Sequence, residues 1–333
     1  MKNLDTANKI LIEIAKNNQN ITPVTLDDLP LFQNCFAKEP HTYGNSWTYV
    51  TQGVYGIGPN NLGYKYYDGT NLSMICVYPK IEQPDLNVFY WIRPMGPGIL
   101  DVIAEISNKL YQQFSLPTYV KKIFSDQYDS LLKKGFVSID KFPWHKYSPT
   151  EDDTFPEQIH NVRNLYMKIK SMHRSSMKRI FMNSDKLTKR YAIEINDTNF
   201  KNTAWQIAQD FFNSEYIKLK KTNLSQAADY YNMIFNNPDR STFTRQVVYS
   251  NKQPVGFFVV EKQNEKYSNF YALILLRHKL KFLADYIWLD IFKNLQTPYL
   301  NTGGSEDEGI HKFKLKFFPE TEQRMYWATN FKN

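Results

Sequence analysis

One stretch of the sequence, residues 301–319, gathers most of the side chains whose types and spacing could carry chemistry. In chain order it holds Asn301, Gly303, Gly304, Glu306, Asp307, Glu308, His311, Lys314 and Pro319. Two adjacent glycines let the backbone approach a ligand closely or adopt a positive φ. A carboxylate beside them could orient or deprotonate an amine, and a lysine could meet a phosphate or a carboxylate. The pattern also suits an ordinary helix start, because acidic residues favour the N-terminal end of the helix dipole and lysines follow on a solvated face.

A second motif, Arg-Pro-Met-Gly-Pro-Gly at 93–98, fits the pattern Arg-x-x-Gly-x-Gly. Backbone N–H groups at a helix N-terminus, together with an arginine, can hold phosphate oxygens. On this interpretation Arg93, Gly96 and Gly98 cradle a pyrophosphate. Pro97 removes one N–H donor, and a Pro-Gly turn that only joins a strand to a helix is the alternative. The corresponding turn later in the chain, 276–284, contains no glycine and four basic residues.

Composition limits the class of protein. The chain has 333 residues, 42% of them hydrophobic, which is enough for two lobes with their own cores. A net charge of +8 favours anionic partners such as RNA, phosphorylated cofactors or acidic lipid. The basic segment 161–182 is either such a patch or a solvated helix face. Two cysteines, Cys35 and Cys76, cannot build a disulfide scaffold, and the six histidines show no metal-ligand spacing, so no metal is expected.

Apolar periodicity predicts the elements that position these residues. In the first half we expect a helix at 5–16, strands at 47–55, 62–67, 72–78 and 86–92, a helix at 99–114, a strand at 118–124 and a helix at 127–134. After a long helix at 161–182, the second half repeats the theme with strands near 191–195, 244–250, 255–260, 270–276 and 297–300, and helices at 203–216, 226–235 and 282–295. The expected fold is therefore α+β, with two tandem lobes at 1–148 and 161–333 joined by a connection at 149–160. Each lobe is a mostly antiparallel twisted sheet flanked by helices.

No apolar signal core begins the chain, and no run of residues reaches the length of a membrane span, so we expect a cytoplasmic protein without a transmembrane segment.

This layout resembles two lobes of the GNAT acyltransferase superfamily in tandem. It is similar to the Fem-type aminoacyltransferases and to the C-terminal catalytic domain of phosphatidylglycerol lysyltransferases. Three short motifs carry the resemblance: the Pro-x-Gly segment within 93–98, the pair Arg163-Asn164, and the stretch 301–319, in which Asp307, Gly309, Lys314 and Pro319 match. His311 stands where the lysyltransferases usually carry an arginine.

The resemblance implies an acyltransferase that moves an aminoacyl or acyl group to an amine or hydroxyl acceptor. Its donor would be aminoacyl-tRNA or acyl-CoA, neither of them tightly bound. Asp307, or Glu306 in its place, would hold the donor's amino group or act as a base, and Lys314 would stabilise charge on the ester or phosphate. The implied substrate-binding residues are Arg163, Asn164, Asn301, Gly303, Gly304 and His311, and the implied cofactor-binding residues are Arg93, Gly96 and Gly98.

Two other functions remain open on the sequence. One is a CoA-dependent GNAT N-acetyltransferase that works from the first lobe. The other is a non-catalytic tandem-GNAT module that binds RNA, nucleotide or a membrane surface. The acceptor, whether small molecule, peptide or lipid, and the oligomeric state are not indicated by the residues.

Overall fold

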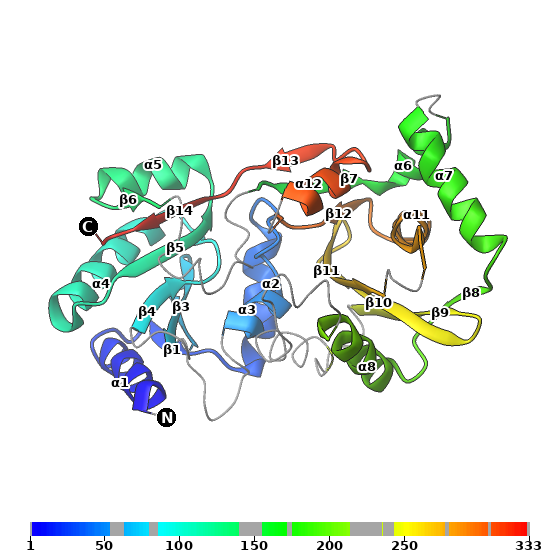
Figure 1. Cartoon of the computed structure of the whole chain (residues 1–333). Coiled ribbons are helices and arrows are strands. Elements are labelled where there is room, and N and C mark those ends of the chain that lie inside the picture. Colours follow the sequence, from blue (N-terminus) through cyan, green and yellow to red (C-terminus); the bar gives the residue numbers. More distant parts are fainter. Residues whose placement is uncertain are drawn as a thin grey trace. The chain divides into compact units, whose positions relative to one another are not determined.

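The computed structural model describes residues 2–53, 63–79, 86–139, 155–171, 175–213, 235, 243–276, 280–305 and 308–331. The chain forms two compact units (Figure 1). Lobe 1 comprises Met1–Glu157, Gly304–Glu308 and Gln323–Asn333, and lobe 2 comprises Gln158–Gly303 and Gly309–Glu322. In the part of the chain that the structure describes, each lobe contains a sheet of seven strands, so the predicted α+β fold with two sheets is confirmed.

Lobe 1 packs its helices against a sheet that apolar side chains cover on both faces. Its helices are α1 (Lys2–Lys16), α2 (Leu29–Ala37), α3 (Trp47–Gly53), α4 (Ile99–Phe114) and α5 (Ser125–Lys133), with a short 3-10 helix at Leu26–Asp28. Its strands are β1 (Ile21–Pro23), β2 (Gly63–Tyr67), β3 (Leu72–Pro79), β4 (Leu86–Tyr90), β5 (Thr118–Ile123), β6 (Val137–Ser138) and β14 (Tyr326–Thr329).

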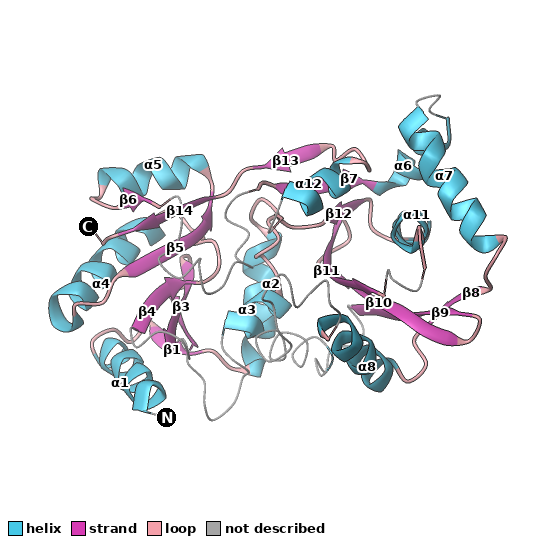
Figure 2. Ribbon diagram, in the orientation of Figure 1, coloured by secondary structure: helices cyan, strands magenta, loops and turns pink. Residues whose placement is uncertain are grey.

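Lobe 2 follows the same plan (Figure 2). Within the described residues, its helices are α6 (Val162–Ser171), α7 (Ser175–Thr188), α8 (Phe200–Phe212), α11 (Leu283–Asn294) and α12 (Glu308–Leu315). Its strands are β7 (Glu157–Asn161), β8 (Ile193–Asn196), β9 (Phe243–Ser250), β10 (Gln253–Lys262), β11 (Tyr267–Leu275), β12 (Tyr299–Asn301) and β13 (Thr321–Gln323).

The two sheets have the same strand order once one exchange is recognised. The first runs β1-β2-β3-β4-β5-β14-β6, and the second, from its other edge, runs β8-β9-β10-β11-β12-β7-β13. β14 therefore takes in the first sheet the place that β7 takes in the second. The sequence led us to expect all of 161–333 in the second lobe, but β14 pairs with β5 and β6 of the first. β7 lies partly in the segment that we expected to be a connection.

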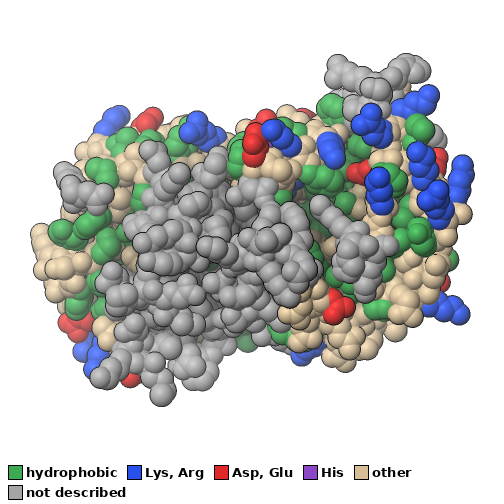
Figure 3. Space-filling model, viewed as in Figure 1, with side chains coloured by type: hydrophobic (Ala, Val, Ile, Leu, Met, Phe, Trp, Pro, Cys, Tyr) green, Lys and Arg blue, Asp and Glu red, His purple; other side chains and the backbone are tan. Residues whose placement is uncertain are grey.

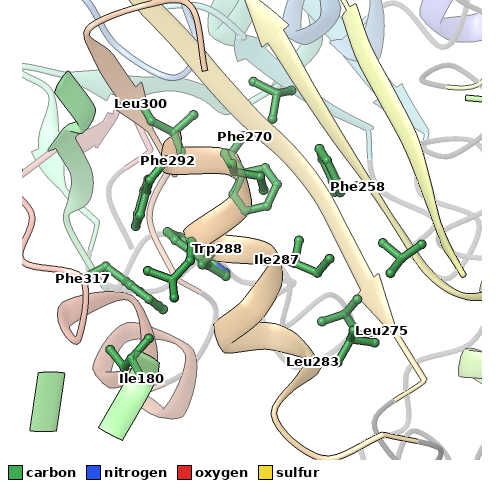
Figure 4. Close-up of a cluster of buried hydrophobic side chains, with 14 of the residues drawn as sticks. Ile180, Phe258, Phe270, Leu275, Leu283, Ile287, Trp288, Phe292, Leu300 and Phe317 are labelled. Carbon is green, nitrogen blue, oxygen red and sulfur yellow. The ribbon is translucent and has the colours of Figure 1, made fainter. Parts of the chain in front are cut away.

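The core of lobe 2 forms around one aromatic side chain of α11 (Figure 4). Trp288 stacks on Phe317, with ring centroids 4.7 Å apart, and meets Phe292 and Phe270 edge to face. Such pairs add to the free energy gained by burying the rings. This packing fixes α11 against the sheet and anchors the chain that leaves α12 at Phe317.

The expected strand at 47–55 is wrong, because Trp47–Gly53 is the helix α3. Tryptophan, threonine, tyrosine and valine favour strands, but the residue before the segment starts a helix. The Ser46 hydroxyl accepts a hydrogen bond from the Tyr49 amide at 3.0 Å, and the Ser46 carbonyl accepts one from the Val50 amide at 3.0 Å. This N-cap outweighs the propensity. The helix expected at 161–182 is divided between α6 and α7, and most of the helix expected at 226–235 lies outside the described residues.

Candidate functional site

The candidate site of lobe 2 lies where the parallel pairing of β11 with β12 stops. The two strands pair from Tyr267 opposite Tyr299 to Asn269 opposite Asn301. Beyond this last pair β11 continues against β10, whereas the chain after Asn301 leaves the sheet. In open α/β sheets, ligands bind outside the carboxyl ends of parallel strands, where neighbouring chains diverge. Both asparagines at this point are fully buried amides.

A tight turn follows Asn301. The Asn301 side-chain oxygen accepts a hydrogen bond from the Gly303 amide at 2.8 Å, and Gly303 has a φ of +67°. A glycine adopts this φ without the strain that a side chain would add. Lys314 of α12 holds the turn from the other side, because its Nζ donates to the carbonyl oxygens of Thr302 at 2.8 Å and Gly303 at 3.4 Å. Lys314 is thus buried and positions the turn.

Three polar side chains meet beside this turn, and we call them the 158–311–322 cluster. Gln158 of β7, His311 of α12 and Glu322 of β13 form it. The Gln158 Nε2 lies 3.3 Å from His311 Nδ1 and 3.2 Å from Glu322 Oε1. The other ring nitrogen of the histidine, Nε2, lies 3.6 Å from the same Glu322 oxygen. Gln158 is fully buried, whereas the side chain of His311 is 15% exposed and that of Glu322 is 43% exposed.

The backbone of β7 ties the cluster to the turn. The Gln158 amide donates to the Gly303 carbonyl at 3.2 Å, and the Gln158 carbonyl accepts from the Thr302 amide at 2.9 Å and from its hydroxyl at 3.1 Å. On the other edge of β7, the Glu320 amide donates to the Ile159 carbonyl at 2.8 Å and brings β13 alongside. β7 is therefore the strand that places all three side chains.

His160, two residues along β7, is a different kind of histidine. Its ring is buried against Trp288 and Phe292, and its Nδ1 lies 3.2 Å from the Phe317 carbonyl oxygen. Burial disfavours the charged imidazolium and lowers the pKa of His160 to about 4. At neutral pH it is an uncharged ring that donates its Nδ1 proton to the Phe317 carbonyl.

No protein-family model and no curated protein matches the sequence, but solved structures match nearly the whole chain. A conserved protein of unknown function from Bacteroides thetaiotaomicron superposes with a TM-score of 0.68 at 11% identity, covering 93% of this chain and 98% of the other. FemX gives 0.60 at 10% identity, covering 94% and 97%. The C-terminal domain of a putative lysylphosphatidylglycerol synthetase from Agrobacterium fabrum gives 0.59 at 10% identity, covering 92% of each chain.

The chain shares its fold with FemX and with this synthetase domain, the two kinds of protein that the sequence layout resembles. The resemblance inferred from the sequence is thereby confirmed at the level of the fold. Identities of 10–11% carry no residue roles, so a function has to be argued from the residues of the site itself.

In lobe 1, the groups expected to cradle a pyrophosphate are engaged within the protein. The Gly98 amide donates to the Asn71 side-chain oxygen at 2.9 Å, and the Arg93 guanidinium pairs with Glu39 at 2.8 Å. Gly96 has a φ of +103°, and a Cβ there would stand 2.7 Å from the Thr70 carbonyl oxygen. The glycines thus serve the close packing of 96–98 against the turn at 70–71. These contacts count against the cradle, which stays a prediction.

The parallel pair of lobe 1 stops at Tyr90 opposite Val120. Just beyond it, β5 carries a β-bulge in which Lys121 and Lys122 lie opposite the single residue Trp327 of β14. Both lysines are buried under aromatic faces. The Lys121 Nζ lies 4.0 Å from the centre of the Trp91 ring. The rings of Phe89 and Trp327 also face Lys121, and those of Tyr43 and Tyr49 face Lys122.

The remaining residues predicted from the sequence fall into two groups. Asp307 and Glu306, the expected catalytic carboxylates, lie outside the described residues, as does the side chain of Asn164. Gly304 follows Gly303 in the same loop, and Arg163 is exposed in the first turn of α6. Among the described residues, no hydrogen bond or ion pair joins Arg163 to the 158–311–322 cluster. The structure thus brings together Asn301, Gly303, His311 and Lys314 from the predicted set.

Sequence reasoning missed Gln158 and Glu322. Both lie on short strands that were not predicted, and they are 164 positions apart. The only signal for β7 is the polar run Glu-Gln-Ile-His-Asn at 157–161, which follows a proline and precedes a helix. Nothing in that run shows which strands flank it.

Two kinds of feature are absent from the part of the chain that the structure describes. No group of three or more histidine, cysteine, aspartate or glutamate side chains there is arranged to hold a metal ion. Likewise, none of the helices in the described ranges combines the length and the apolar character that a membrane span requires.

Proposed function

We propose that this chain is an acyltransferase that moves an aminoacyl or acyl group from an activated donor to an amine or hydroxyl acceptor. Acyl transfer needs three things from a protein: alignment of donor and acceptor, a group that takes a proton, and stabilisation of the charge that develops. It needs little covalent chemistry by the protein itself. The observation that carries the proposal is the site at the end of β11 and β12, where the Asn301–Gly303 turn lies beside a histidine and a carboxylate.

We place the reaction in lobe 2 and take an aminoacyl ester of tRNA as the preferred donor. In lobe 1 the Gly98 amide and the Arg93 guanidinium already have partners, so they are poor candidates for holding the pyrophosphate of coenzyme A. In lobe 2 the corresponding turn has no glycine. The Fem-type and lysyltransferase enzymes that the sequence resembles use aminoacyl-tRNA, which does not require such a cradle.

The surface of lobe 2 supports an RNA donor. Exposed basic side chains gather on α6, on α7 and just after α7: Arg163, Lys178, Arg179, Lys186, Lys189 and Arg190. Blue side chains are numerous over the part of the molecule that carries α7 (Figure 3). Lysine and arginine contacts to phosphates supply most of the sequence-independent affinity for nucleic acid. We call this set the α6–α7 basic surface.

The proposed roles combine the sequence motif at 301–319 with the geometry of the turn. Asp307, with Glu306 as the alternative, would hold the ammonium group of an aminoacyl donor. The turn at Asn301–Gly303 would present its backbone to the ester. Lys314 would keep that turn in place, and charge stabilisation on the ester remains the second role proposed for it.

The experiment is a donor comparison with the purified chain. One reaction contains tRNA charged with a mixture of radiolabelled amino acids, and the other contains radiolabelled acetyl-CoA. Each is supplied with spermidine, glycylglycine or phosphatidylglycerol vesicles as acceptor. Label transferred from charged tRNA supports the aminoacyl proposal, and label transferred from acetyl-CoA points to the CoA-dependent alternative. Transfer or hydrolysis from neither donor contradicts an acyltransferase.

A further inference from the structure

We propose that His311 is the proton acceptor of the reaction, with Glu322 and Gln158 as the residues that orient it. The proposal deepens the function proposed above and rests on it. It concerns a residue that the sequence placed only among substrate contacts, and the geometry of the 158–311–322 cluster carries it.

The tautomer of His311 follows from its neighbours. An ionised carboxylate only accepts hydrogen bonds, so the atom of Gln158 that lies 3.2 Å from Glu322 Oε1 must be the amide nitrogen. The same nitrogen lies 3.3 Å from His311 Nδ1 and can only donate to it. Nδ1 therefore carries the lone pair. The ring proton is then on Nε2, which lies 3.6 Å from Glu322 Oε1, close enough for an ion pair once the ring takes a second proton.

This is the arrangement that a general base requires. A carboxylate on one side of an imidazole fixes the tautomer and stabilises the imidazolium that forms when the opposite nitrogen takes a proton. The side chain of His311 is 15% exposed, so the ring borders solvent, and Glu322 is more open still. His160, on the same strand as Gln158, cannot serve in this way, because it is enclosed by Trp288 and Phe292.

A second observation points to a ligand at the cluster. The Gln158 side-chain oxygen is buried and has no hydrogen-bond partner among the described residues. A buried acceptor without a partner destabilises the fold, because it has lost its water and gained nothing in exchange. A nucleophilic amine can satisfy both groups, since one of its N–H bonds can point to this oxygen and another to His311 Nδ1. Gln158 would then exchange its contact with His311 for one with the substrate.

In the proposed reaction one bond forms, one bond breaks, and His311 carries one proton between them. The acceptor nitrogen attacks the ester carbonyl carbon of the donor, and a C–N bond forms as the bond from that carbon to the tRNA 3′-terminal oxygen breaks. The proton of the attacking nitrogen passes to His311 Nδ1. It then moves to the leaving oxygen, which departs as a hydroxyl group, and His311 returns to its starting state. With a hydroxyl acceptor, a C–O bond forms in place of the C–N bond.

The test measures turnover of tRNA charged with radiolabelled amino acids, with spermidine, glycylglycine or water as the nucleophile. His311→Ala is expected to lower kcat by about 10²–10⁴-fold, the usual contribution of a general base, with little change in the donor KM. Added imidazole should restore part of the lost rate, more so for more basic derivatives. His311→Gln keeps a side chain of similar reach and should be as slow. Glu322→Gln should give a smaller loss of kcat. The matched control Glu320→Gln, an exposed carboxylate two residues away, should leave turnover unchanged.

Two results would overturn the proposal. One is a folded His311→Ala chain that turns over within about threefold of wild type, far short of the general-base contribution. The other is loss of activity in folded His311→Ala without rescue by any imidazole, which would make His311 structural. A wild-type chain that transfers from neither donor contradicts the acyltransferase itself. In that case ¹⁵N NMR of the imidazole still decides the geometry, since a proton on Nδ1 would refute the tautomer assigned to His311.

Discussion

The two lobes share a strand order but differ at the point where their parallel strands separate. In lobe 1 the last parallel pair is Tyr90 and Val120, and the residues beyond it are an aromatic ring and a buried lysine. In lobe 2 the last pair is Asn269 and Asn301, followed by a glycine turn and a histidine beside a carboxylate. The same topology therefore places aromatic packing around lysines at one strand end, and buried amides beside a partly exposed histidine and carboxylate at the other.

The end of the parallel strand pair in lobe 1 serves packing, and a β-bulge explains how. A bulge lets consecutive residues of one strand escape the normal alternation of faces. It allows both Lys121 and Lys122 to reach one aromatic wall, in which Tyr49 stacks on Trp91 with centroids 5.2 Å apart. Cations over ring faces gain on the order of 0.5–2 kcal/mol each. Lys122 has a φ of +52°, so the arrangement is maintained against local backbone strain.

The largest effect expected from this comparison is on the stability of lobe 1. Trp91→Ala removes a buried ring that contacts Lys121 and Tyr49, and it should lower the free energy of unfolding by about 3–5 kcal/mol. Urea denaturation followed by circular dichroism measures it. Trp91→Phe is the matched variant, because it retains a ring face but loses the hydrogen bond from Trp91 Nε1 to the Tyr49 carbonyl at 2.7 Å. A loss below about 1 kcal/mol in Trp91→Ala would mean that the wall is not structural, since truncating a buried aromatic ring normally costs several times more.

The next effect is a pH dependence that belongs to lobe 2. The pKa of His160 in the folded chain is about 4, below its ordinary value because the ring is buried. The imidazole of His160 therefore binds a proton more readily in the unfolded chain. Its contribution to the free energy of unfolding is fully present above about pH 6.5 and is lost as the pH drops toward 4. The difference in pKa corresponds to about 3 kcal/mol. Chemical denaturation of wild type and His160→Gln between pH 4 and 7 isolates the part of the unfolding free energy that depends on His160. Parallel curves for the two chains would show that His160 is not responsible.

A smaller effect separates two glycines in the predicted cradle. Gly96→Ala places a Cβ 2.7 Å from the Thr70 carbonyl oxygen at a positive φ, and we expect a loss of about 1–3 kcal/mol. Gly98→Ala meets Asn71 at ordinary contact distance, 3.6 Å or more, and should be nearly neutral. Thermal unfolding of the two variants compares these losses.

The same variants test the cradle with a ligand. Because the Gly98 amide already has a partner, millimolar coenzyme A should shift the unfolding temperature of neither wild type nor Gly98→Ala. A saturable shift that is lost in Gly98→Ala would restore the cradle in lobe 1.

Local patterns predicted local structure well. The spacing of Ile99, Ile103, Ile106 and Leu110 predicted α4 with its observed ends, and Asp68-Gly69 marked the hairpin between β2 and β3. The sequence was misleading where tertiary pairing decides. β7 and β14 are four or five residues long, and each joins a sheet through strands far away in the chain. No periodic pattern in the sequence shows that these two strands change places between the lobes.

The candidate site divides along the same line. The residues of the candidate site that the sequence predicted, Asn301, Gly303, His311 and Lys314, lie within one short stretch, so a local pattern was enough to select them. Gln158 and Glu322 could not be found in that way, because only the pairing of β7 with its neighbours brings them to His311. The sequence placed Lys314 in the site but did not show that it holds the turn, because its hydrogen bonds to the turn depend on how α12 packs.

The smallest effect tests whether donor recognition belongs to lobe 2 alone. Removing Lys178 and Arg179, two exposed residues of α7, deletes two expected phosphate contacts from the α6–α7 basic surface. Each lost contact should lower the slope of log affinity against log salt by about one, so the double alanine variant should lose about two from it. Filter binding of charged tRNA between 50 and 200 mM salt, roughly the range over which phosphate contacts are lost, measures this slope. The matched control is a double alanine variant at Lys9 and Lys133, exposed residues of lobe 1. Because those lysines lie away from the proposed surface, their loss should leave the slope unchanged; an equal decrease in both variants would show that the attraction comes from net charge and not from α7.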